Sequence, residues 1–160
     1  MNTITINLPN GIKATPELIK RINLAVKPDI AESHAILICQ REFGQSFKVA
    51  SYNKKGFDVV SEDDTIIVEV KQTSCKEKSF TRLGVGSVMP KKHLCTHMMI
   101  FDYYNDINRV SIIPHDEFFN SVIHAEDKAG VWRWDINYGK GKNAVMVENT
   151  QLFLKYEKQI

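Results

Sequence analysis

The sequence predicts an α/β domain built on a mixed β-sheet with helices packed against it. Three observations favour this fold class: two stretches with helical spacing of apolar residues come first, short β-branched stretches separated by turns follow, and an apolar strand then leads into further α and β elements. The chain has 160 residues, of which 43% are hydrophobic and 25% are charged. Because this is the balance of one globular unit with one core, we expect residues 1–160 to form a single domain.

The first half of the chain is predicted to hold two helices and a strand meander. A short strand at Ile4–Leu8 precedes a helix that starts after Thr15. A second helix is expected from Asp29 to Phe43, where Gly44 ends it. Its apolar face consists of Ala31, Ala35, Ile38 and Cys39. The strands that follow are Ser46–Ala50, Phe57–Val60 and Thr65–Lys71, the last two joined by the turn Ser61–Asp64.

The second half is predicted to begin with a long loop. Between Ser74 and Lys92 no clear period is present, and glycines and a proline interrupt the chain. His93–Tyr104 is apolar on both faces, which favours a central strand covered on both sides. The remaining expected elements are a strand at Arg109–Ile113, a helix from Pro114, a strand at Ala144–Val147 and a short helix at Gln151–Lys158.

Charge and cysteine content exclude some classes of protein and leave others open. Twenty-one basic residues against nineteen acidic ones give a net charge near zero, so overall charge does not indicate a nucleic-acid partner. The basic residues gather in predicted loops, where they can either be solvated or contact a polyanion. No stretch resembles a signal peptide or a membrane span, and the three cysteines form no CxxC pair. We therefore expect a cytoplasmic protein with no membrane contact.

The strand Thr65–Lys71 carries two charged residues within an otherwise apolar stretch. Side chains alternate across a strand, so Glu69 and Lys71 point to the same face. Burying charge is costly unless the charges are paired or bind a metal. Asp58, on the preceding strand, can approach Glu69 through antiparallel pairing across the turn.

Two converging carboxylates predict a divalent cation between them, because they otherwise repel each other. The ligands on offer are oxygens, which favours Mg²⁺ held by Asp58 and Glu69, with Mn²⁺ as a substitute. Such an ion polarises a phosphoryl oxygen and lowers the pKa of a water molecule. Lys71 can orient that water, assist its deprotonation or stabilise transition-state charge. These parts suit phosphodiester hydrolysis.

The residues Asp58 and, after ten intervening positions, Glu69-Val70-Lys71 resemble the D…(D/E)xK signature of the PD-(D/E)xK nuclease superfamily. The predicted element order from Asp29 to Phe119 is similar to the core of that superfamily, which implies a restriction endonuclease-like, three-layer fold. The proline that often precedes the motif aspartate is Phe57 here. The resemblance, closest in layout to small type II restriction endonucleases, implies a Mg²⁺-dependent endodeoxyribonuclease. It would cut double-stranded DNA as a homodimer in the cytoplasm and be encoded by a bacterium, an archaeon or a phage.

The resemblance also implies a catalytic role for Glu32. Many members of the superfamily carry a glutamate on the helix before the meander, where it reaches the metal site directly or through water. Glu32 therefore joins Asp58, Glu69 and Lys71 as a catalytic candidate. In the alternative interpretation, Asp29 and Glu32 are a helix N-cap and its reciprocal acid, a purely local device.

Contacts with DNA are expected mainly from the predicted loops. Thr73 shares the face of Glu69 and Lys71 if the strand continues, and it can then hydrogen-bond a phosphate. Basic side chains can neutralise phosphates without reading bases, although each one is equally an ordinary surface charge. The candidate DNA-binding residues are Thr73, Ser74, Lys76, Lys78, Arg82, Lys91, Lys92, Lys140 and Lys142.

Other hypotheses stay open. Glu69 and Lys71 can form the salt bridge of a surface hairpin, and a nuclease fold can carry a site that is no longer used. A Holliday-junction resolvase or a repair nuclease would share the site. A non-catalytic nucleic-acid-binding module on the same fold would bind without cutting, and an α/β interaction domain would do neither.

Overall fold

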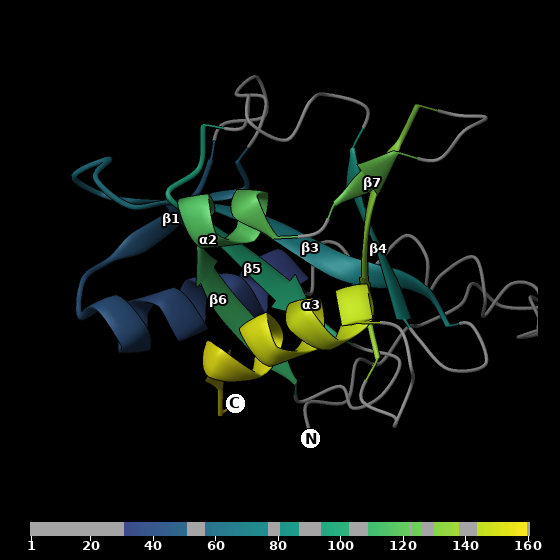
Figure 1. Ribbon diagram of the computed structural model, residues 1–160. Coiled ribbons are helices and arrows are strands. Elements are labelled where there is room, and N and C mark those ends of the chain that lie inside the picture. Colours follow the sequence, from purple (N-terminus) through teal and green to yellow (C-terminus); the bar gives the residue numbers. More distant parts are fainter. Residues whose placement is uncertain are drawn as a thin grey trace, which may run out of the picture.

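A computed structural model describes residues 31–50, 57–76, 81–86, 94–102, 109–121, 123–125, 130–137 and 144–159. Within these ranges, nine strands form one mixed sheet with helices on its faces (Figure 1). The predicted fold class, a central mixed sheet flanked by helices in three layers, is confirmed. The expected N-terminal strand and first helix lie outside the described ranges, and the assignment of residues 1–160 to a single domain stays a prediction.

The sheet is organised around its longest strand, β3. The strands are β1 (Phe47–Val49), β2 (Val59–Ser61), β3 (Ile67–Lys76), β4 (Thr81–Gly86), β5 (His97–Phe101), β6 (Val110–Pro114), β7 (His124–Ala125), β8 (Trp132–Ile136) and β9 (Glu157–Lys158). Their order is β7-β8-β4-β3-β5-β6-β9, while β2 pairs with β3 and with β1. β3 runs antiparallel to β2 and β4 and parallel to β5.

A helix over residues 31–43 covers one face of the sheet. Its buried positions are Ala31, Ala35, Ile38 and Cys39, which is the apolar face expected from the sequence. They form a core cluster with Val59 and Val68, among other residues of the sheet. Gly44 follows the helix with a φ of 68°, a left-handed conformation that glycine adopts without strain. The predicted end of this helix is therefore confirmed.

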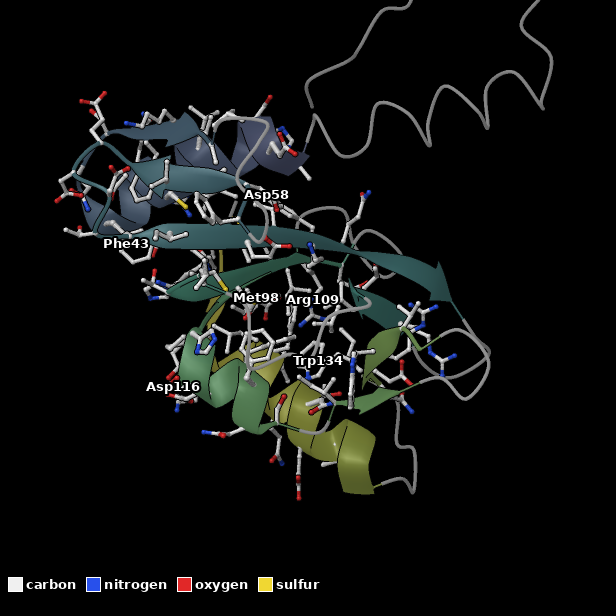
Figure 2. All side chains as sticks on the ribbon, turned by 90° about the horizontal axis from the view of Figure 1, so that it is seen from above. Phe43, Asp58, Met98, Arg109, Asp116 and Trp134 are labelled. Carbon is white, nitrogen blue, oxygen red and sulfur yellow. The ribbon has the colours of Figure 1, made fainter. Side chains whose placement is uncertain are left out.

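Two further helices, α2 (His115–Asn120) and α3 (Ala144–Lys155), cover the opposite face. Seen from above, the strands separate these helices from the helix of residues 31–43, and Met98 and Trp134 lie on the α2–α3 side (Figure 2). Four consecutive residues of β5, Met98 to Phe101, are 0% exposed. β5 is thus the central strand, covered on both faces, that its sequence predicts. No helix among the described residues is long and apolar enough to cross a membrane.

The expected loop from Ser74 to Lys92 is wrong in its first part. β3 continues to Lys76, and residues 81–86 form β4, which pairs with both β3 and β8. Leu83 and Val85 alternate with less buried residues and are each 1% exposed, which is the pattern of a half-buried strand. Because β4 contains two glycines, its alternating pattern is not apparent in the sequence.

The C-terminal prediction also needs correction. Ala144–Val147 is the first turn of α3 and not a strand, and the helix ends at Lys155, after which β9 takes the place of the expected helix end. Asn149, Thr150 and Phe153 are buried at helical spacing in α3. The stretch from Pro114 is confirmed as a helix only from His115 to Asn120, because Pro114 belongs to β6.

Candidate active site

The candidate site lies where β2 and β3 separate. β2 pairs with β3 through Val59 and Val68, and the backbone N–H of Asp58 still donates to the carbonyl of Val68 at 2.9 Å. The next donor on β3, the N–H of Val70, instead donates to the carboxylate Oδ2 of Asp58 at 2.7 Å. The Asp58 side chain therefore replaces a backbone acceptor at the end of the β2–β3 ladder.

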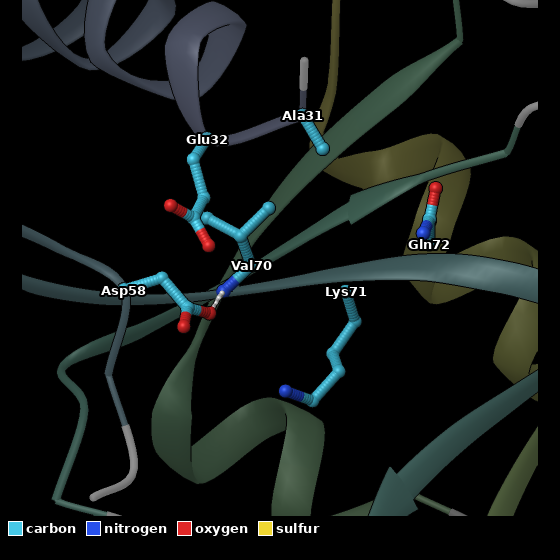
Figure 3. Close-up of a pocket in the computed structure, with 6 residues that line it drawn as sticks. All are labelled: Ala31, Glu32, Asp58, Val70, Lys71 and Gln72. Carbon is cyan, nitrogen blue, oxygen red and sulfur yellow. Dashed lines mark hydrogen bonds between the residues drawn. The ribbon is translucent and has the colours of Figure 1, made fainter. Parts of the chain in front are cut away.

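A pocket of about 230 Å³ opens at this separation. β4 pairs with β3 only from Thr73 onward, so residues 69–72 lie between the two partner strands. The pocket is lined by Ala31, Glu32, Asp58, Val70, Lys71 and Gln72. Figure 3 shows the Glu32 side chain extending from its helix toward Asp58. Three of the four catalytic candidates, Glu32, Asp58 and Lys71, thus line one pocket.

The fourth candidate, Glu69, forms an ion pair with Lys71 through its Oε1. The two side chains share a face of β3, as strand alternation predicts. Glu69 is 5% exposed, and its second oxygen, Oε2, is buried with no hydrogen-bond partner in the described structure. One oxygen of a nearly buried carboxylate therefore has no protein partner in the described ranges, although Glu69 itself does not line the pocket.

Asp58 lies in an environment that disfavours its charged form. Burial raises the pKa of the Asp58 carboxyl above its ordinary value, and the negative charge of Glu69 raises it further. The hydrogen bond from Val70 and the positive charge of Lys71 act in the opposite direction but are smaller effects. A cation held by both carboxylates would remove their mutual repulsion.

Asp58 and Glu69 offer the kind of oxygen ligands that Mg²⁺ binds, but only part of a full coordination shell. Within the described ranges, no group of three or more His, Cys, Asp or Glu side chains could hold a metal ion. Mg²⁺, however, is usually bound by one or two carboxylates, with waters and substrate phosphates completing its shell. Asp58 and the unpaired oxygen of Glu69 match that arrangement, whereas a cage made only of protein ligands is not present in this part of the chain.

Glu32 can reach this site only from the helix side of the sheet. It is partly exposed and lines the pocket at the start of the described helix. Its alternative role, as the reciprocal acid of an N-cap, involves Asp29, which lies outside the described residues. A role for Glu32 close to the metal therefore stays a prediction.

Two predicted DNA-binding residues lie in strands and have partners inside the protein. The Thr73 hydroxyl, which is 5% exposed as a residue, donates to Asp102 at 3.1 Å. Arg82 donates two hydrogen bonds to Asp135, at 2.9 and 3.0 Å. Arg82 was expected in a loop but lies in β4, whereas Thr73 lies in β3, which continues past Lys71. Their contacts with DNA stay predictions.

The remaining DNA-binding candidates cannot be placed by the described structure. The backbones of Ser74 and Lys76 belong to β3, but their side chains are outside the description. The other five predicted positions lie outside the described residues, namely Lys78, Lys91, Lys92, Lys140 and Lys142. These contacts stay predictions as well.

Gln72 lines the pocket, although the sequence analysis did not select it. Its amide oxygen, Oε1, is buried with no hydrogen-bond partner in the part of the chain that the structure describes. The signal was present in the sequence, since Gln72 directly follows Lys71 and strand alternation places it on the face of Val70. The significance of that position appears only once the separation of β2 and β4 along β3 is known.

Comparison with known proteins provides a fold but no family. No protein-family model and no curated protein matches the sequence. Among solved structures, the chain is similar to the bacterial homing endonuclease I-Ssp6803I, with a TM-score of 0.53 and 14% sequence identity. The similarity covers 91% of this chain and 88% of that one. The chain therefore shares its fold with a known endonuclease.

Proposed function

We propose that the protein is a metal-dependent endodeoxyribonuclease of the PD-(D/E)xK type, which hydrolyses phosphodiester bonds of double-stranded DNA. The observation that carries this proposal is the proximity of Asp58, Glu69 and Lys71 where the sheet separates, with one buried carboxylate oxygen that has no partner among the described residues. The fold shared with a homing endonuclease supports it. Asp58 and Glu69 would hold the cation, and the preferred ion would be Mg²⁺, with Mn²⁺ as a substitute.

Each residue of the site has a separate role in the reaction. Bound Mg²⁺ supplies Lewis-acid polarisation of the phosphoryl oxygen and a more acidic water. The Val70 N–H fixes the orientation of the Asp58 carboxylate. The Lys71 ammonium, held beside Glu69, stabilises negative charge on the phosphate as water attacks phosphorus. The hydroxyl of that water joins phosphorus, one P–O ester bond breaks, and the remaining proton goes to the leaving oxygen.

Cleavage of both DNA strands requires two copies of the site. One chain contributes one set of Asp58, Glu69 and Lys71, so we propose that a homodimer acts on duplex DNA in the cytoplasm, as restriction enzymes do. A homing-type endonuclease is the second candidate function, because a solved structure with a similar fold is a homing endonuclease. A resolvase or a repair nuclease would use the same residues on branched or damaged DNA.

A cleavage assay with two lysine variants tests the proposal. Purified wild-type protein, Lys71→Met and Lys155→Met would be incubated with plasmid, phage, branched and single-stranded DNA in Mg²⁺, in Mn²⁺ and in EDTA. Lys155 is a matched control because it is exposed on α3 and is not one of the residues that line the pocket. We expect wild type and Lys155→Met to cut in Mg²⁺, and Lys71→Met to cut about 10²–10⁴-fold more slowly.

Two results would contradict the proposal. Cleavage that persists in EDTA, or that is equal in Lys71→Met and wild type, would exclude this site as its source. Absence of cleavage on every substrate in both metals would favour a binding module on the same fold. Discrete fragments would indicate a sequence-specific enzyme, whereas a substrate preference for branched DNA would indicate a resolvase.

A further inference from the structure

Gln72 combines two features that are rarely found together at a structural position. Its amide oxygen is buried without a hydrogen-bond partner among the described residues, and the same residue lines the pocket beside Asp58 and Lys71. Most buried polar groups in native proteins are hydrogen-bonded, because an unpaired acceptor has lost its contact with water and gained nothing in return. An exception located in a candidate active site points to a function for that atom.

The backbone explains how Gln72 reaches the pocket. Alternation along β3 places Gln72 and Val70 on one side of the strand and Lys71 on the other, as Figure 3 shows. Residues 69–72 lie between β2, which ends its pairing at Val68, and β4, which starts at Thr73. Side chains from both faces of β3 can therefore line one pocket at this edge.

The Gln72 amide oxygen restricts which chemical groups can be its partner. An amide oxygen can only accept a hydrogen bond or bind a cation. The non-bridging oxygens of a DNA phosphate are acceptors as well, so they cannot pair with it. The ammonium of Lys71 is engaged with Glu69. A water molecule is a small donor that fits this atom, and it is also the second reactant in phosphodiester hydrolysis.

We propose that Gln72 is a positioning residue whose amide oxygen accepts a hydrogen bond from a water molecule in the pocket and so directs that water toward the scissile phosphate. This inference rests on the proposed nuclease function and adds a residue to it. Gln72 orients the attacking water from the helix side of β3, while Lys71 acts from the opposite side. Gln72 then orients the water and Lys71 stabilises the charge on the phosphate, so neither residue has to do both.

The first test is stability, which does not depend on activity. Replacing Gln72 with Met, at nearly constant volume, exchanges a buried acceptor that has no protein partner among the described residues for an apolar group, so the denaturation midpoint of metal-free protein in EDTA should rise. Asn149→Leu is the matched control, because the Asn149 amide is also buried but donates to the carbonyl of Asp135 at 3.1 Å. That variant should have a lower midpoint than wild type.

The second test is single-turnover cleavage. Gln72→Met should cut about 10- to 100-fold more slowly than wild type, because the water loses its alignment, while DNA affinity and Mn²⁺ affinity stay unchanged. Gln72→Glu keeps an acceptor oxygen at the same position and should retain more activity than Gln72→Met. A lower Mn²⁺ affinity in Gln72→Met would show that Gln72 binds the metal itself, which would overturn the assignment to water.

The outcomes separate this inference from the proposed function. If wild type cuts DNA and Gln72→Met cuts equally fast, or loses stability as Asn149→Leu does, the role of Gln72 is overturned and the nuclease function stands. If wild type cuts no DNA in Mg²⁺ or Mn²⁺, both are overturned. A stabilised, slow Gln72→Met variant that binds DNA and metal normally is the expected result.

Discussion

At the scale of single residues, the site concentrates features that reduce stability. Asp58 has a raised pKa because of burial and the charge of Glu69, and Glu69 and Gln72 each have a buried oxygen for which the described residues provide no hydrogen-bond partner. These three residues lie within fifteen positions of the chain, from 58 to 72, and around one separation in the sheet. Natural proteins retain such features mainly at functional sites, where stability and activity conflict.

Replacing Asp58 with Asn should therefore stabilise the metal-free protein while abolishing cleavage. The neutral amide removes repulsion with Glu69 and keeps an oxygen to accept from the Val70 N–H. We expect a gain of about 0.5–2 kcal/mol in the free energy of unfolding at neutral pH in EDTA, measured by chemical denaturation. The gain should shrink as the pH falls toward the ordinary pKa of aspartic acid, because the wild-type carboxyl is then protonated too.

Asp63→Asn provides the control for that measurement. Asp63 is in the turn between β2 and β3, and hydrogen bonds from Ser61 and Thr65 lower the pKa of its carboxyl. Its ionised form is thus favoured by folding, and Asp63→Asn should lower stability at neutral pH. If both variants lose stability, the interpretation of Asp58 as a destabilising group is wrong.

At the scale of elements, prediction from sequence succeeded where one periodicity dominated. The helix of residues 31–43, the turn after β2 and the apolar β5 each follow from local spacing and were predicted. β4 was missed because two of its six residues are glycines. At Gly84 the neighbour is tertiary: an added Cβ would lie 2.9 Å from Nη1 of Arg133, so the end of that flexible side chain would have to shift.

The strand predicted at Ala144–Val147 is wrong because tertiary contacts decide the structure of this segment too. The sequence from Ala144 to Val147 favours a strand by its β-branched residues, but packing on the sheet decides in favour of a helix. On the buried side of α3, Asn149 donates to the carbonyl of Asp135, and the Ser111 hydroxyl donates to the carbonyl of Phe153. These contacts join segments far apart in the sequence, so no local pattern reveals them.

The Arg82–Asp135 pair should determine how firmly β4 is held to β8. Asp135 is 3% exposed, and Arg82 binds it through two nitrogens. Arg82→Met leaves a buried carboxylate without this cation and should cost about 2–3 kcal/mol in unfolding free energy, measured by chemical denaturation. Arg41→Met, which breaks the exposed pair with Glu42, should change stability by less than about 1 kcal/mol. Equal effects of the two variants would contradict this assignment.

At the scale of the whole molecule, two layers of the fold meet at the pocket, the helix of residues 31–43 and the sheet. The helix of residues 31–43 contributes Glu32 to the pocket from one face, and β3 contributes Lys71 from the other side of the strand. The separation of β2 and β4 along β3 leaves room for the pocket between them. The sequence predicted the fold class and the positions of Asp58, Glu69 and Lys71, because both depend on strand alternation and one hairpin.

Two features could not be predicted from the sequence, because both depend on pairing between distant segments: that Gln72 lines the pocket, and that Thr73 has Asp102 as its partner. The pocket at Gln72 depends on where β4 begins to pair with β3. The partner of Thr73 depends on β5, because Asp102 directly follows that strand and accepts a hydrogen bond from the Thr73 hydroxyl. A single sequence does not specify such pairings between distant segments. It indicates the site but not the contacts that surround it.

Metal binding by the whole protein tests the central claim most directly, because it requires no knowledge of the DNA substrate. Mn²⁺ would be titrated calorimetrically into wild type, Asp58→Asn, Glu69→Gln and the control Asp63→Asn. We predict saturable binding by wild type and Asp63→Asn, and affinity at least about tenfold weaker in the other two variants. Equal affinity in all four proteins, or a loss in Asp63→Asn as large as in Asp58→Asn, would contradict a metal site formed by Asp58 and Glu69.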